Sequence, residues 1–170
     1  MDANPAKIVP HLWYAREAEE AARFYASVFP ASRVEEVTTL PADSPSGPAG
    51  TVTVVRFTLF GQPFMAISAG PHDPFNDAVS FLVLCEDQEE VDRYWGAFLR
   101  DGAEPQACGW IVDRFGVRWQ IVPRRLHEML GDPDPTRAGR VAEEMLRQVK
   151  LDLARLEEAY RAAPPVDPSR

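Results

Sequence analysis

The sequence predicts an α+β fold of two paired β-α-β-β-β modules, followed by a helical extension at the C-terminal end. Two amphipathic helices 70 residues apart share one pattern, Glu-Glu-x-x-Arg followed by two aromatic residues, at residues 19–25 and 89–95. An apolar strand precedes each helix, and Gly61 and Gly116 open the last strand of each half. Two such modules would place eight strands in two curved mixed sheets around a common cleft.

The first module is expected over residues 1–69. Apolar residues at helical spacing predict a helix over residues 15–29, and Pro30 ends it. β-branched and aromatic residues mark the strands, and Gly61 indicates the turn of a hairpin. The predicted strands are residues 7–14, 33–40, 51–60 and 62–69.

The second module is expected over residues 70–123. Residues 78–85 form its most apolar strand, which predicts a central position in the sheet. Asp87, with Glu90 three residues later, is the predicted N-cap of a helix over residues 87–100. Two short strands, residues 110–113 and 117–122, should flank a turn set by Asp113 and Gly116.

The extension is expected over residues 124–170. A short helical turn at 125–130 and a Pro-rich break precede one long predicted helix, residues 136–162, and a disordered tail from Pro164. The apolar stripe of this helix could dock on its own module or on a second copy of the chain. Because such a stripe is unfavourable in water, it favours a homodimer. The stripe consists of Leu146, Val149, Leu153, Leu156 and Tyr160.

Charge and composition exclude several classes of protein. The chain has 170 residues, of which 18 are basic and 26 acidic, so its net charge of −8 argues against a nucleic-acid binder. Its longest apolar run is five residues, residues 81–85, whereas a membrane span needs about 20. The N-terminal residues do not show a basic start followed by an apolar core, which is the pattern of a secretory signal. A cytoplasmic location is therefore expected. Cys85 and Cys108 form no C-x-x-C motif and are expected to be free thiols.

Five motifs together resemble the PhnB-like family of the vicinal oxygen chelate superfamily, which also holds glyoxalase I, extradiol dioxygenases and bleomycin-resistance proteins. They lie at residues 12–25, 61–66, 70–81, 85–95 and 108–123. The domain is often labelled 3-demethylubiquinone-9 3-methyltransferase. No glycine-rich strand-to-helix loop that could hold S-adenosylmethionine is present, so we do not expect a genuine methyltransferase.

The resemblance also implies where a metal would be bound. In the superfamily's enzymes, His, Glu or Gln from the first and last strands of each half hold a divalent metal that binds two adjacent substrate oxygens. The matching positions here are His11 or Pro10, Met65 or Ala66, Ser80 and Gln120. At best His11 and Gln120 remain, with a weak Ser80, whereas zinc or iron usually needs three or four good donors. We therefore expect no metal and no cofactor, and we assign no catalytic residue.

The candidate ligand-binding residues are polar or aromatic side chains that could line the cleft. They are His11, Trp13, Arg56, Phe75, Ser80, Trp110 and Gln120. For each, an ordinary packing role stays open: His11 could pack against Trp13 and the helix, Arg56 could pair with an acid across the sheet, and the aromatic residues could belong to the core.

The sequence thus predicts a small-molecule binding protein of the glyoxalase/bleomycin-resistance type without a functional metal site. One alternative is an enzyme of the same superfamily that acts on a substrate with adjacent oxygens. Another is a structural or regulatory dimer whose cleft is filled by its own side chains. The expected partners are a small molecule and a second copy of the chain, with no nucleic acid and no membrane.

Overall fold

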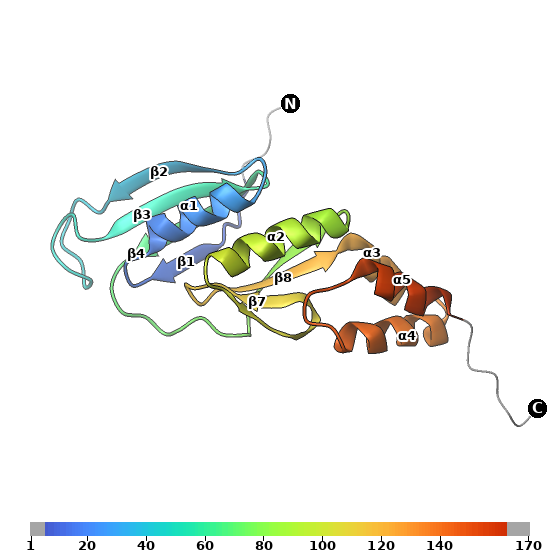
Figure 1. Ribbon diagram of the computed structural model, residues 1–170. Coiled ribbons are helices and arrows are strands. Elements are labelled where there is room, and N and C mark those ends of the chain that lie inside the picture. The colour runs from blue at the N-terminus through green and yellow to red at the C-terminus, as the bar shows by residue number, and fades with distance from the viewer. Residues whose placement is uncertain (1–5, 163–170) are drawn as a thin grey trace, which may run out of the picture. The chain divides into compact units, whose positions relative to one another are not determined.

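The computed structural model describes residues 6–162 and divides the chain into two compact units, the first ending at Pro74 and the second beginning at Phe75. Each unit contains one four-stranded mixed sheet, and neither sheet closes on itself (Figure 1). The second unit also carries the helical extension. The predicted α+β fold class is confirmed.

In the first unit, one helix packs on a sheet of order β1-β4-β3-β2, in which only β1 and β4 run parallel. Its elements are β1 (His11–Tyr14), α1 (Ala18–Val28), β2 (Arg33–Thr39), β3 (Thr53–Leu59) and β4 (Gln62–Ser68). The predicted elements are thus present, with ends shifted by a few residues.

Helix α1 covers one face of this sheet. Tyr25 of the helix is fully buried, and its hydroxyl lies 3.1 Å from the hydroxyl of Tyr14 on β1. At the start of α1, the backbone N–H of Ala18 donates to Ser68 Oγ on β4 at 3.0 Å, so a side chain from the sheet caps the helix. Strand residues alternate between faces, so the neighbours of Tyr14 and Ser68 point away from α1.

In the second unit, the sheet has the equivalent order β5-β8-β7-β6, again with one parallel pair, β5 and β8. The central position predicted for the most apolar strand is therefore wrong, because β5 lies at the edge of this sheet. Its elements are β5 (Phe81–Cys85), α2 (Gln88–Arg100), β6 (Glu104–Pro105), the 3₁₀ turn Ala107–Gly109, β7 (Trp110–Val112) and β8 (Arg118–Pro123). Strand β6 was not assigned from the sequence, because Glu and Pro carry no strand signal.

Two local predictions in this unit are confirmed. The backbone N–H of Glu90 donates to the Asp87 carboxylate at 2.9 Å, so Asp87 is the N-cap of α2. In the β7–β8 turn, Gly116 N–H donates to the carbonyl of Asp113 at 2.9 Å.

The internal repeat holds for the helices at an offset of 70, but the first strands, β1 and β5, match at an offset of 71. His11 pairs with Met65 and Leu82 pairs with Gln120, and Met65 and Gln120 each follow the opening glycine of their strand by four residues. Leu12 therefore does not correspond to Leu82, although the two are 70 residues apart: Leu12 is 8% exposed and Leu82 is 43% exposed, on opposite faces. The strand-to-helix connection has three residues in the first unit and two in the second.

The single long helix predicted for the extension is wrong. The extension contains α3 (Arg124–Leu130), α4 (Pro135–Leu146) and α5 (Leu153–Arg161). The carbonyls of Gln148 and Val149 accept hydrogen bonds from Cys108 and Gly109, at 2.8 and 2.7 Å, instead of continuing the helix. The carboxylate of Asp152 then caps α5 by accepting from Arg155 N–H at 3.1 Å.

The predicted apolar stripe is accordingly broken. Leu146 is 66% and Val149 is 49% exposed, whereas Leu156 is buried. The three helices instead enclose a core with the end of β8, formed by Val122, Leu126, Met129, Val141, Leu151 and Leu156. The tail predicted from Pro164 lies outside the described residues. No helix within residues 6–162 is long and apolar enough to cross a membrane.

Candidate functional site

Three of the predicted site residues lie on the face of the first sheet opposite α1, which we call the helix-free face of the first sheet. His11 is in register with Met65, Met65 with Arg56, and Arg56 with Glu36. Trp13 lies two residues after His11 on the same face and is 43% exposed. His11 is exposed and points away from α1, so it does not pack against the helix.

A pocket of about 740 Å³, which we call the first-sheet pocket, lies in the first unit. It is beside the row of paired residues that runs across the sheet from His11 through Met65 and Arg56 to Glu36. Its lining combines apolar side chains with two glutamates and one arginine. The lining residues are Ala6, Val9, Glu35, Glu36, Arg56, Phe57, Thr58, Gly61, Pro63, Phe64 and Met65. This volume lies in the range of small-molecule sites, roughly 300–1,000 Å³.

The two glutamates reach the same pocket because strand β2 is irregular at this point. The pairing with β3 shifts between Val34 and Glu36, which leaves Glu35 as the extra residue of a β-bulge. Glu36 accepts from Arg56 Nη1 at 3.1 Å, and Glu35 pairs with Arg33 at 2.9 Å. The alternative that Arg56 pairs with an acid across the sheet is thus what the structure shows, at an exposed position.

The other four predicted residues belong to the second unit. Gln120 Nε2 donates to Ser80 Oγ at 2.8 Å, and Gln120 is in register with Trp110 on β7. Trp119, beside Gln120, points to the opposite face and packs between the rings of Phe81 and Phe98, with centroids 5.2 and 5.4 Å away. Gln120, Ser80 and Trp110 therefore share a face of the second sheet that does not belong to the core under α2.

Arg118 holds the loop that carries Phe75. Its Nε donates to the Asp77 carboxylate at 2.8 Å, and its Nη1 donates to the carbonyls of Phe75 at 2.8 Å and Gly116 at 2.6 Å. Arg118 lies on the same face of β8 as Gln120, and no role was assigned to it from the sequence. The position of Arg118 could have indicated this role, because Arg118 lies two residues before Gln120, a predicted site residue, on the same strand face.

The side chains at the positions where the resemblance would place a metal form a weak donor set. In the first unit, His11 is followed in its row by a thioether and then by the guanidinium of Arg56, which repels a cation. In the second unit, the amide of Gln120 is hydrogen-bonded to Ser80. Within residues 6–162, no group of three or more His, Cys, Asp or Glu side chains could hold a metal ion. These residues do not fit the three or four donors that zinc or iron requires.

Both cysteines are free thiols, as predicted, and their surroundings differ. Cys85 is fully buried in β5, and burial, with a smaller contribution from the Glu90 carboxylate, raises the pKa of its thiol to about 12. Cys108 is half-buried in the turn before β7.

This contrast predicts the pattern of thiol modification. At pH 8, iodoacetamide should label Cys108 in the native protein and leave Cys85 unmodified, because a raised pKa keeps that thiol protonated and burial blocks access. Peptide mass spectrometry measures the labelling, and protein unfolded in urea, where both thiols should react, is the control. Equal labelling of both cysteines in the native protein would contradict the placement of Cys85 in the core.

The family model for 3-demethylubiquinone-9 3-methyltransferase matches residues 6–122, which is more than half of the chain. The chain belongs to this family. The PhnB protein of Bacillus cereus is 33% identical in sequence, with alignment over 68% of this chain and 97% of that one and a TM-score of 0.59. The predicted resemblance to the PhnB-like family is confirmed.

Two solved structures with lower sequence identity share the fold of this chain. A protein of Pseudomonas aeruginosa is 23% identical, over 67% of this chain and 94% of that one, with a TM-score of 0.50. The fosfomycin resistance protein FosX of Listeria monocytogenes is 13% identical, over 76% of this chain and all of that one, with a TM-score of 0.52. No curated protein matches the chain. The family match stops at residue 122, so helices α3, α4 and α5 lie beyond it.

Proposed function

We propose that this PhnB-like protein binds a small molecule with an apolar body and an anionic group in the first-sheet pocket, without a metal. The observation that carries the proposal is the joint position of Arg56 and the apolar side chains of Val9, Pro63 and Met65 in one pocket of about 740 Å³. A mostly apolar wall with a few polar groups is the usual composition of a ligand site.

Arg56 can accept an anionic group because its present partner holds it weakly. The Arg56 and Glu36 side chains are both at least half exposed, and exposed ion pairs contribute only about 0–1 kcal/mol. Among the described residues, Arg56 uses one of its five N–H donors, at Nη1. A ligand carboxylate can therefore share the guanidinium or replace Glu36.

The methyltransferase activity in the family's name finds no support in the architecture, and we propose that the protein does not use S-adenosylmethionine. The strand-to-helix connections, residues 15–17 and 86–87, contain no glycine. Each sheet has a single parallel pair, whereas nucleotide-type cofactors are usually bound by glycine-rich loops at the ends of several parallel strands.

Opposite charge changes in the pocket test the proposal. A panel of aromatic and aliphatic carboxylates, including benzoate and hexanoate, is screened against the full chain by thermal shift. Arg56→Ala should weaken binding of any hit at least about tenfold, because a charge-assisted hydrogen bond is lost. Glu36→Gln should strengthen binding, because it frees the guanidinium.

A matched control is Arg23→Ala, which removes an equally exposed arginine from α1, where it pairs with Glu19 at 2.7 Å. This variant should bind like the wild type. Hits whose affinity rises in Arg56→Ala and falls in Glu36→Gln would overturn the proposed anionic ligand and point to a cationic one.

Native mass spectrometry of the same untagged protein separates the alternatives. Our proposal expects a homodimer whose mass contains no metal and which gains the mass of a carboxylate hit. One divalent metal per chain would favour an enzyme of the vicinal oxygen chelate type. A dimer that binds no compound of the panel would favour a structural or regulatory role.

A further inference from the structure

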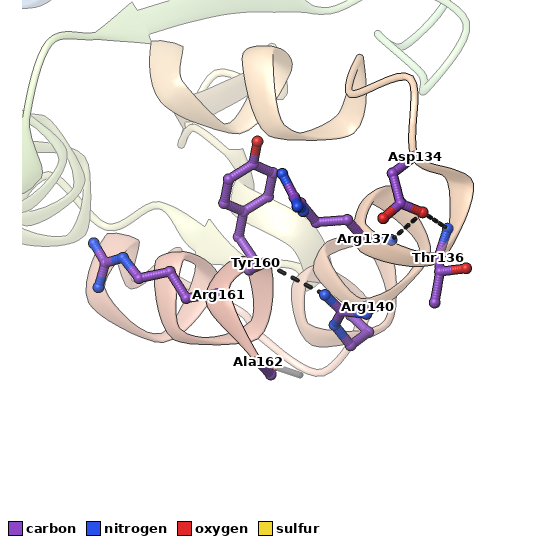
Figure 2. Close-up of a pocket in the computed structure, with 7 residues that line it drawn as sticks. All are labelled: Asp134, Thr136, Arg137, Arg140, Tyr160, Arg161 and Ala162. Carbon is purple, nitrogen blue, oxygen red and sulfur yellow. Dashed lines mark hydrogen bonds between the residues drawn. The ribbon is translucent and has the colours of Figure 1, made fainter. Parts of the chain in front are cut away.

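A second pocket lies in the helical extension, between the start of α4 and the end of α5, and we call it the extension pocket. It has a volume of about 500 Å³ and contains three arginines and one carboxylate. Its lining residues are Asp134, Thr136, Arg137, Arg140, Tyr160, Arg161 and Ala162 (Figure 2). All of them lie beyond the family match, which ends at residue 122.

We propose that the extension pocket binds a phosphate group, free or as part of a phosphomonoester, through Arg137 and Arg140. Guanidinium groups present several N–H donors in a fixed plane, which suits the oxygens of a phosphate dianion. The volume leaves room for an organic group attached to the phosphate.

Arg140 supplies a positioned charge that no carboxylate in the described part of the chain balances. Its Nε donates to the carbonyl of Ala159 at 3.0 Å, and its Nη2 donates to the carbonyl of Tyr160 at 3.4 Å. These bonds fix the half-buried guanidinium at the last turn of α5, and within residues 6–162 the N–H groups of Nη1 have no acceptor. Among the described residues, Arg140 forms no ion pair, so its charge is available to a bound anion.

Arg137 is held against an aromatic ring beside this charge. Its guanidinium carbon lies 5.1 Å from the centroid of the Tyr160 ring, and Figure 2 shows the two side chains together. Tyr160 is itself fixed, because its hydroxyl donates to the Asp132 carboxylate at 2.5 Å. The Arg137–Asp132 pair is long, 3.5 Å, and although Asp132 is largely buried, the Arg137 side chain is 44% exposed, so Arg137 can still contact an anion.

The remaining charged groups oppose such binding only weakly. Asp134, the only carboxylate in the lining, already accepts from the N–H groups of Thr136 at 2.9 Å and Arg137 at 3.4 Å as the N-cap of α4. Arg161 points away from the other two arginines in Figure 2 and pairs with Glu157, so we give it no role. Two guanidiniums and the hydroxyl of Thr136 are left for the anion.

Titration of the full chain with inorganic phosphate at constant ionic strength tests this site. Isothermal calorimetry should give saturable binding, with a dissociation constant on the order of 1 mM for a bare ion held by two arginines. Arg140→Ala should weaken phosphate binding at least about tenfold, and Arg140→Lys less, because it keeps a charge but loses the planar set of donors.

The matched control is Arg147→Ala, since Arg147 follows α4, is exposed and pairs only loosely with Glu143 and Glu144 at 3.8 and 3.9 Å. It should bind phosphate like the wild type, as should Arg56→Ala, which separates this site from the first-sheet pocket. If Arg140→Ala does not fold by circular dichroism, Arg137→Ala replaces it with the same expected loss. Absence of saturable binding up to about 10 mM phosphate, or equal binding by all variants, would overturn the proposal.

Discussion

Replacing Asp113 with alanine is expected to lower the free energy of unfolding by about 3–5 kcal/mol, the largest loss we predict for a single side chain. The carboxylate is 4% exposed at the β7–β8 turn. It accepts hydrogen bonds from the backbone N–H groups of Phe115 and Val117 and from Trp119 Nε1, all at 2.9 Å. Alanine would leave these donors without this acceptor, and two of the three bonds are buried.

Urea denaturation measures this loss, and a neighbouring acid provides the control. Asp101 pairs with Arg114 at 2.7 Å near the surface, so Asp101→Ala should cost no more than about 1 kcal/mol. Asp113→Asn should be intermediate, because its side chain keeps one acceptor oxygen. If Asp113→Ala costs no more than Asp101→Ala, the carboxylate does not organise the turn.

The elements that the sequence predicted correctly are those fixed by neighbouring residues. The N-cap Asp87 needs only the N–H of Glu90, three residues away, and the Asp113 turn is closed within five residues. The burial pattern of α2 follows from helical spacing in the same way. Interactions between residues only a few positions apart can therefore be predicted from the sequence alone.

The break between α4 and α5 could not be predicted because its cause is distant in sequence. The residues that replace the helical hydrogen bonds, Cys108 and Gly109, precede their partners Gln148 and Val149 by 40 residues. No proline or glycine marks the break, and the apolar spacing of 3, 4, 3 and 4 was compatible with a continuous helix.

The candidate site shows the same division between local and distant signals. Strand alternation explains why His11 and Trp13 share one face of β1, and why Arg118 and Gln120 share one face of β8. The bulge that brings Glu35 and Glu36 into one pocket left no signal, because register depends on the partner strand. The extension pocket was also missed, since it exists only because α5 folds back beside α4.

Within the second unit, the contact of the extension with the turn before β7 leads to the other large expected effect, that of Gly109→Ala. Gly109 has a φ of +81°, and an added Cβ would lie 2.9 Å from the carbonyl oxygen of Ile121 and 3.0 Å from Leu151 Cδ1. The backbone cannot move aside freely, because Gly109 N–H donates to the Val149 carbonyl at 2.7 Å. Strain of about 1–2 kcal/mol and overpacking of about 1–3 kcal/mol together predict a loss of about 2–5 kcal/mol.

Two other glycines separate these contributions in the same urea experiment. Gly102 has a φ of +90° but nothing within 4 Å of an added Cβ, so Gly102→Ala should show the strain alone. Gly139 lies inside α4 with open space around it, so Gly139→Ala should stabilise the protein by about 0.5–1 kcal/mol. A cost for Gly109→Ala no larger than for Gly102→Ala would mean that Leu151 does not press on this turn. A larger loss of unfolding free energy for Gly109→Ala than for Gly102→Ala would show that Leu151 of the extension packs tightly against the turn directly before Trp110, a predicted site residue.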